Sequence, residues 1–162
     1  MPDMEYLVNM AAFLAAGYAM GMGALGPAFG IGYTAGRAQE GMSRQVMQQG
    51  SLFRMMLVGQ ALAETSGVLA LVVAFALLFA RGGGEGLEKA AAVLASGFSV
   101  GTAAVGVGVG NGLSAGTACV AAARHPKHFA GIQQAMLVGT AVSQSTGVYA
   151  FVISLLLIFY SS

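Results

Sequence analysis

One acidic residue lies in the middle of a long apolar stretch of this chain. Glu64 is the only charged residue between Met55 and Ala80, in the segment MMLVGQALAETSGVLALVVAFALLFA. An ionised carboxylate in hydrocarbon is costly unless it is paired, so acids in such segments usually mark ion or proton pathways. Glu64 is therefore the first candidate for chemistry, as a group that binds and releases a proton or a cation.

The same segment recurs 80 residues later with an amide in place of the acid. Residues 135–160 read AMLVGTAVSQSTGVYAFVISLLLIFY, and Gln144 stands where the first copy has Glu64. A glutamine side chain forms hydrogen bonds but carries no exchangeable charge. The sequence therefore predicts one ionisable site per chain rather than two.

The composition indicates that lipid surrounds these segments. Of the 162 residues, 57% are hydrophobic and 8% are charged, and the mean hydropathy is +0.76, whereas soluble domains have about 25% charged residues. Four stretches, uncharged apart from Glu64, exceed the roughly 20 residues that a membrane-spanning helix needs. They are Tyr6–Gly36, Met55–Phe79, Ala90–Ala123 and Ala130–Ser162. We expect an all-α membrane protein with four transmembrane helices, and a net charge of +1 argues against a nucleic-acid partner.

The four helices form two tandem hairpins. At the 80-residue spacing, six glycines recur in the first helix of each copy: Gly17, Gly21, Gly26, Gly30, Gly32 and Gly36 match Gly97, Gly101, Gly106, Gly110, Gly112 and Gly116. We therefore divide the chain into a hairpin with the acid (1–80), a connecting loop (81–89) and a hairpin with the glutamine (90–162). Small residues let membrane helices approach closely, which favours the inner wall of a tight ring. A compact four-helix monomer is the alternative.

The basic residues predict the orientation in the membrane. Five of the seven lie near the first and third connections: Arg37, Arg44, Arg54, Arg124 and Lys127. Basic loops stay in the cytoplasm, so we expect loops 37–54 and 124–129 to be cytoplasmic and both termini to lie on the opposite side. The N-terminal MPDMEYLVNM is acidic where a signal peptide would be positive.

No cysteine or histidine metal site, no cofactor site and no nucleotide site is predicted. Cys119 lies within an apolar segment, and a single cysteine cannot form a disulfide within one chain. His125 and His128 share a basic loop with no acid or cysteine nearby, unlike a metal site. The segment GVGVGNG (106–112) lacks the lysine and the flanking strand of a phosphate-binding loop.

The motifs resemble a known membrane family. GYTAGRAQEGMSRQ followed by VGQALAETSG is similar to the c subunit, or proteolipid, of rotary ATP synthases. The duplication resembles the fused four-helix proteolipids of V-type rotary ATPases, but those keep the acid on the last helix. The turns at Arg44-Gln45 and Arg124-His125-Pro126 resemble the F-type turn. The resemblance is thus to a duplicated F-type, or F/V hybrid, c subunit whose second carboxylate has been lost.

The resemblance implies a function and partners. Chains would form a homo-oligomeric ring, with or without other c subunits, in a bacterial plasma membrane. Glu64 would face outward and carry one proton or Na⁺ past a stator a subunit with an essential arginine, which couples ion flow to ring rotation. Central-stalk subunits would dock at the turns, on Arg44, Gln45, Arg124, His125 and Pro126. The chain would catalyse nothing by itself.

Residues around Glu64 bear on which ion is carried. Thr65 and Ser66 follow the acid, and the neighbouring hairpin would add Ser143, Gln144, Ser145 and Tyr149. Sodium-type members of the family resemble one another in placing a glutamine on the glycine-rich helix, where this chain has Ile31 and Asn111. A proton needs one acceptor, whereas a hard cation needs about six oxygens. We favour H⁺, with no metal bound; Na⁺ on Glu64, Gln144 and Ser145 stays open.

Other functions fit some of these observations. A small channel or a secondary transporter would line its pathway with Glu64, but many transporters are built from inverted repeats and this repeat is parallel. A membrane scaffold would use Glu64 only as a hydrogen-bonding residue, for example to Gln60. A scaffold would tolerate Glu64→Gln, whereas an ion carrier would lose coupling.

Overall fold

The computed structural model describes residues 2–79 and 86–160 and contains four long helices. Helix α1 spans Pro2–Arg44, α2 spans Gln49–Phe79, α3 spans Leu87–Arg124 and α4 spans Phe129–Tyr160. Short 3-10 helices, η1 (Val46–Gln48) and η2 (Pro126–His128), form the turns of the two hairpins. Residues 81–85 of the predicted connecting loop lie outside the described residues, and α3 begins within its remainder.

All four helices are long and apolar enough to cross a membrane. At about 1.5 Å per residue, the 43 residues of α1 and the 38 of α3 exceed the roughly 30 Å of a hydrocarbon core. The all-α fold with four membrane-length helices is confirmed.

The first turn is shorter than the predicted 37–54 loop. Helix α1 continues to Arg44, and α2 starts at Gln49. Glu40 pairs with Arg37 at 2.6 Å and with Arg44 at 2.9 Å. Such pairs, three and four residues apart, stabilise a helix, so charged residues that suggested a loop extend the helix instead.

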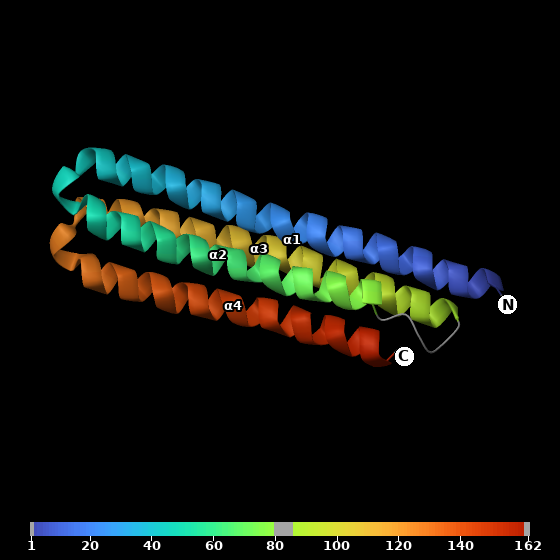
Figure 1. Cartoon of the computed structure of the whole chain (residues 1–162). Helices are drawn as coiled ribbons and strands as arrows, with labels where there is room; N and C mark the ends of the chain where they lie inside the picture. The colour runs from blue at the N-terminus through green and yellow to red at the C-terminus, as the bar shows by residue number, and fades with distance from the viewer. Residues whose placement is uncertain (1, 80–85, 161–162) are drawn as a thin grey trace.

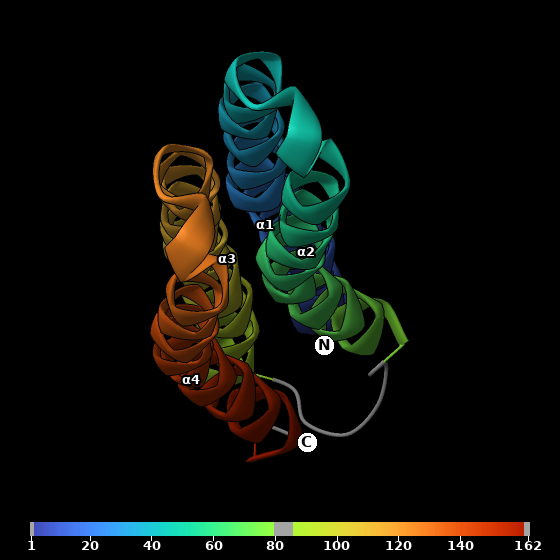
Figure 2. The ribbon, with the colours of Figure 1, turned by 90° about the vertical axis from the view of Figure 1, so that its left-hand side faces the viewer.

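The two hairpins lie side by side along the whole rod (Figures 1 and 2). Both turns are at one end, and the N-terminal end of α1 and the C-terminal end of α4 are at the other (Figure 1). The most extensive contact between the hairpins joins α1 to α3, while α2 contacts both α3 and α4. The glycine-rich helices therefore form one side of the rod, and α2 and α4 form the other.

Glycines bring the backbones of α1 and α3 into direct contact. A Cβ atom added to Gly112 would lie 2.5 Å from the carbonyl oxygen of Gly30 and 2.6 Å from its carbonyl carbon. A Cβ atom on Gly108 would lie 2.5 Å from the nitrogen of Pro27. Any larger side chain would push the helices apart, so close packing of these helices requires glycine.

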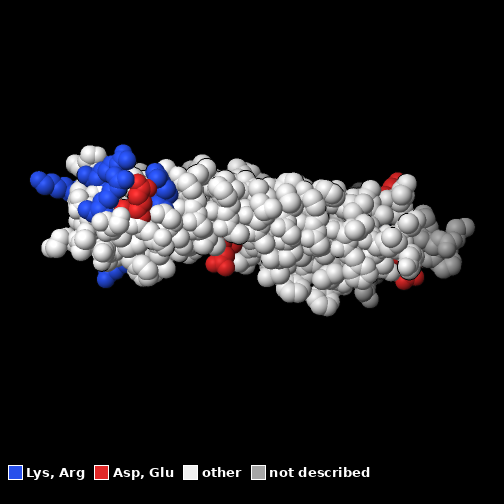
Figure 3. All heavy atoms as spheres, turned by 90° about the horizontal axis from the view of Figure 1, so that it is seen from above, with Lys and Arg blue, Asp and Glu red and all other residues white. Residues whose placement is uncertain are grey.

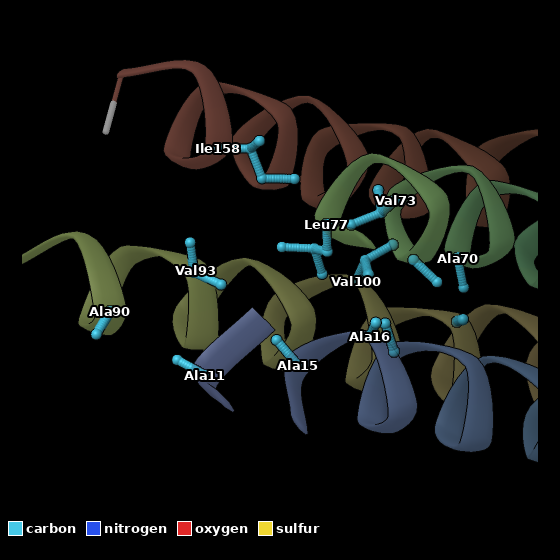
Figure 4. Close-up of a cluster of buried hydrophobic side chains, with 13 residues drawn as sticks. Ala11, Ala15, Ala16, Ala70, Val73, Leu77, Ala90, Val93, Val100 and Ile158 are labelled. Atoms are coloured by element: carbon cyan, nitrogen blue, oxygen red, sulfur yellow. The ribbon is translucent and has the colours of Figure 1, made fainter. Parts of the chain in front are cut away.

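Two apolar clusters fill the rod, with polar contacts between them. The cluster at the terminal end contains Ala15, Val73, Leu77, Val100 and Ile158, among others (Figure 4). The cluster at the turn end contains Leu52, Met55, Cys119 and Met136. Lys and Arg side chains gather at the turn end, and the middle of the rod has little charge (Figure 3). The candidate site lies in this middle part.

Candidate ion-binding site

Glu64 lies on the outer face of α2. The adjacent Ala63 and Ser66 are buried against the rest of the chain, so the helix turns Glu64 away from the core. Leu57, Val68 and Leu71 share its exposed face. Within the described part of the chain, the Glu64 carboxylate has no hydrogen bond and no ion pair. An unpaired acid thus stands on an apolar surface.

A hydrogen-bonded contact joins the two hairpins beside Glu64. Gln144 Nε2 on α4 donates to the carbonyl oxygen of Leu62 at 2.6 Å and also to Thr65 Oγ1. Asn111 Nδ2 on α3 donates to the same carbonyl at 3.1 Å. We call these four residues, Leu62, Thr65, Asn111 and Gln144, the hairpin joint. The joint consists of backbone and side-chain oxygens on α2 that face amide donors on the second hairpin.

The hairpin joint is buried at Asn111, half-buried at Leu62 and Gln144, and exposed at Thr65. Asn111 is fully buried, and its Oδ1 atom has no hydrogen-bond partner among the described residues. Gln144 is half-buried. Thr65 Oγ1 also donates to the Leu62 carbonyl at 2.8 Å, which leaves the lone pairs of that hydroxyl free to accept from Gln144. The carbonyl of Leu62 therefore receives three side-chain donors.

The predicted site residues fall into three groups in the structure. Thr65 and Gln144 meet in the hairpin joint. Ser66 is buried and donates to Ala104 at 3.3 Å and Ala63 at 3.2 Å, so its hydroxyl points toward α3.

The third group lies on α4. Ser145 donates to the carbonyl of Val142 in its own helix at 2.7 Å. Tyr149 is 65% exposed, and Ser143 is half-buried. None of these three has a hydrogen bond to Glu64 among the described residues. Their side chains remain available to a neighbouring molecule.

The position equivalent to Asn111 in the first hairpin is Ile31. Its side chain offers no oxygen, and its backbone carbonyl accepts a hydrogen bond from Gln60 Nε2 at 3.3 Å. Gln60 is thus directed to α1, not to the Glu64 carboxylate one turn away. In the first hairpin, Glu64 has fewer polar neighbours than Gln144 has in the second.

The predicted docking residues lie together at the turn end. Arg44, Gln45 and Arg124 line a cavity of about 110 Å³ between the ends of α1 and α3. His125 and Pro126 form the start of the second turn, and the two turns have the same local form. Gln45 has φ −131° and ψ 75°, and His125 has φ −127° and ψ 68°. The turn end therefore has two turns of equivalent backbone form, each with basic side chains.

Sequence reasoning missed one oxygen of the site. The carbonyl of Leu62 is a backbone group, and an apolar residue gives no sign that its carbonyl accepts side-chain donors. The available signal was Thr65, since a threonine three residues later commonly bonds back to a helix carbonyl. The sequence marks Asn111 only as the counterpart of Ile31.

Comparison with known proteins identifies the family. The family of the ATP synthase C subunit matches residues 14–77 and again residues 94–157. The chain is similar to the ATP synthase c subunit of Alkaliphilus oremlandii, at 49% identity over 75 residues, which are 46% of this chain and 84% of that protein. It is 46% identical over 81 residues to the ATP synthase c subunit of Natranaerobius thermophilus, covering 50% of this chain and 93% of that protein. The ATP synthase c subunit 2 of Cereibacter sphaeroides is 44% identical over 74 residues, 46% of this chain and 89% of that protein. Each relative thus corresponds in length to one of the two hairpins, and the chain belongs to the ATP synthase C subunit family as a tandem duplication of its hairpin.

Proposed function

We propose that this chain is a rotor subunit that carries one proton on Glu64 per chain. The observation that carries this proposal is the unpaired Glu64 on an exposed apolar face of a membrane-length helix. A carboxyl group that faces lipid is stable only when it is neutral. Protonation keeps Glu64 neutral in lipid, and an aqueous path with the arginine of a stator a subunit would let it ionise and exchange.

Glycines with empty space beside them support assembly of this chain with further copies of itself. Four glycines of α3 pack against α1, and their equivalents on α1 have no heavy atom within 4 Å of an added Cβ among the described residues. The packed set is Gly97, Gly101, Gly112 and Gly116; the open set is Gly17, Gly21, Gly32 and Gly36. The open glycines fit the α3 face of a second copy.

At two other pairs of equivalent glycines, the packed member lies on α1 and the open member on α3. A Cβ on Gly26 or Gly30 of α1 would collide with the backbone of α3. Among the described residues, a Cβ on Gly106 would have no neighbour within 4 Å, and one on Gly110 would meet only Ser143 Oγ at 3.6 Å. Each chain thus has two different faces that fit one another. Repeated head-to-tail contact of this kind closes into a ring when the rotation allows it.

This repeat also indicates which groups complete the site at Glu64. Shifted by 80 residues, the contact of Gln144 with Leu62 and Thr65 becomes a contact of Glu64 with Val142 and Ser145 of the next chain. Ser145 Oγ bonds to the Val142 carbonyl at 2.7 Å, as Thr65 Oγ1 bonds to the Leu62 carbonyl at 2.8 Å. The same acceptor arrangement is therefore present on the free face of α4, with Ser143 and Tyr149 nearby in sequence.

The surroundings of Glu64 favour a proton over sodium. A protonated carboxyl donates one hydrogen bond, for which the carbonyl of Val142 suffices. A sodium ion needs about six oxygens, but Ile31 offers no side-chain oxygen, and the amide nitrogen of Gln144 already donates within the hairpin joint. We therefore assign H⁺ as the transported ion, with no metal or other cofactor.

The basic turn end is the proposed docking site for the central stalk. Arg44, Gln45 and Arg124 line one cavity, and His125 and Pro126 form the adjacent turn. Basic ends of this kind favour the cytoplasm, so both turns would face the cytoplasm of a bacterium and the termini the opposite side.

Labelling with a carbodiimide tests the proposal. Carbodiimides attack protonated carboxyl groups in apolar surroundings, so the assembled protein should be modified at Glu64, and sodium should not protect it. Protection of Glu64 by sodium would show that the transported ion is Na⁺ rather than H⁺. Absence of labelling at Glu64 at every pH would contradict an ion-carrying role, and a monomer or small oligomer in mild detergent would favour a channel or a transporter.

A further inference from the structure

We propose that Gln144 is a permanent internal ligand, whose amide keeps ions and protons out of the hairpin joint. This inference rests on the proposed function, because it assigns opposite roles to the hairpin joint and to the equivalent contact of Glu64 with the next chain. We call that second contact the joint between chains. The joint between chains exchanges a proton at Glu64, whereas the hairpin joint within each chain stays occupied by the Gln144 amide through the whole cycle.

The Gln144 amide supplies more hydrogens than a carboxyl group would. A protonated carboxyl at this position would donate one hydrogen, whereas the amide nitrogen of Gln144 donates two. The structure uses both, one to the Leu62 carbonyl and one to Thr65 Oγ1. The amide therefore fills two acceptors at once, and unlike a carboxyl it has no proton to release.

The Leu62 carbonyl that these donors share has no lone pair left for a cation. The oxygen of Leu62 accepts from Gln144 at 2.6 Å, from Thr65 at 2.8 Å and from Asn111 at 3.1 Å. A cation at the joint would need this oxygen, but N–H groups, which carry partial positive charge, already surround it. Among the described residues, the two amide oxygens of the joint, Oδ1 of Asn111 and Oε1 of Gln144, accept no hydrogen bond. Two oxygens are far short of the about six ligands of a hard cation.

The two hairpins differ in the amide donors that they supply. Asn111 supplies the second amide to the hairpin joint, and its counterpart Ile31 has no donor in its side chain. The joint between chains therefore lacks both amides, because Glu64 replaces Gln144 and Ile31 replaces Asn111. The hairpin joint has fixed amide donors, and the joint between chains lacks them. This difference distinguishes an occupied site from an exchangeable one.

Side-chain amide exchange tests this inference directly. We would label the glutamine and asparagine side chains with nitrogen-15 in the full chain, assembled in lipid bilayers, and measure hydrogen exchange by NMR. We expect the amide hydrogens of Gln144 and Asn111 to exchange about tenfold more slowly, or slower still, than those of exposed glutamines such as Gln39 and Gln49. Their resonances should not move when sodium is added.

Substitutions assign the side-chain amide signals to residues and test the contact of Gln144 with Thr65. Gln144→Leu should remove the slow glutamine signal, and Thr65→Val should speed the exchange of Gln144 while Asn111 stays slow. Thr117→Val is the matched control, because Thr117 is exposed and its hydroxyl bonds, among the described residues, only to carbonyls of its own helix. This substitution should change neither signal. If Gln144→Leu does not assemble, the response to Thr65→Val identifies the signal instead.

The outcomes separate this inference from the proposed function. Exchange of Gln144 as fast as that of exposed glutamines, or a shift of its resonance with sodium, would overturn the internal-ligand role. Carbodiimide labelling of the same sample reports on Glu64 independently. Slow Gln144 exchange without labelling at Glu64 would refute proton transport, and labelling at Glu64 with fast Gln144 exchange would refute only the internal ligand.

Discussion

Gly112→Ala should destabilise the isolated chain relative to Gly32→Ala, although the two positions are equivalent in the repeat. At Gly112 the new methyl group would lie 2.5 Å from the Gly30 carbonyl oxygen and 2.6 Å from the carbonyl carbon. A Cβ atom added to Gly32 has no heavy atom of the described residues within 4 Å, apart from the adjacent backbone of α1 itself. The first change overfills the contact of α1 with α3, and the second does not touch it.

The expected difference in unfolding free energy follows from two terms, helix propensity and packing. Both substitutions gain about 1 kcal/mol of helix propensity, so that term cancels in the comparison. Overfilling a packed contact costs about 1–3 kcal/mol, and the obstacle at Gly112 is backbone, which cannot rotate away. We expect Gly112→Ala to be less stable than Gly32→Ala by that amount, or about 5- to 150-fold in the unfolding equilibrium.

Two measurements are needed. Unfolding of the dissociated chain by SDS, followed by circular dichroism in mixed micelles, gives the stability difference. The fraction of assembled protein after mild solubilisation gives the effect on contacts between chains, where Gly32 of one copy is proposed to meet Gly110 of the next. Gly32→Ala should therefore fold normally and assemble poorly. Equal unfolding of the two variants would refute the packing argument, and normal assembly of Gly32→Ala would refute the proposed contact between copies.

Three further predictions concern charge. Glu64→Gln should abolish carbodiimide labelling and reduce ATP-driven proton uptake in membrane vesicles to the background level; retained uptake would exclude Glu64 as the carrier. Gln144→Glu should add a second labelled carboxyl to each chain, seen by mass spectrometry of the peptide, and absence of that label would show that the hairpin joint cannot hold a protonated acid. Replacing Arg44 and Arg124 together by alanine should weaken co-purification of the stalk subunits with the rotor, most clearly at raised salt because charge interactions are screened, and unchanged co-purification would exclude these arginines from docking.

The fold was predictable because its determinants are local. The length and hydropathy of each segment are sufficient to predict four membrane-crossing helices, and the 80-residue repeat is visible by alignment of the chain with itself. The outward direction of Glu64 also follows a local pattern, since Ala63 and Ser66 are small and buried while Val68 is exposed. The extent of α1 was underestimated because charges at Arg37 and Glu40 can belong to a loop or to a helix with ion pairs.

The site was predicted only in part because its contacts depend on how the hairpins are placed side by side. The sequence indicates that Gln144 lies near the first hairpin, but it does not indicate whether the amide reaches Glu64 or the residues beside it. The structure directs Gln144 to the Leu62 carbonyl and Thr65. That choice depends on the contact of α2 with both α3 and α4, a tertiary arrangement that no local pattern specifies.

The short connection between Phe79 and Leu87, which links the two hairpins, bears on the order of assembly. A short covalent tether gives the two parts that it joins an effective concentration of the order of millimolar, far above that of separate subunits in a membrane. The contact inside each chain should therefore form during or soon after synthesis, before any contact between chains. In an assembly made of this chain alone, carboxyl and amide hairpins would then alternate in equal number, whatever the level at which the gene is expressed.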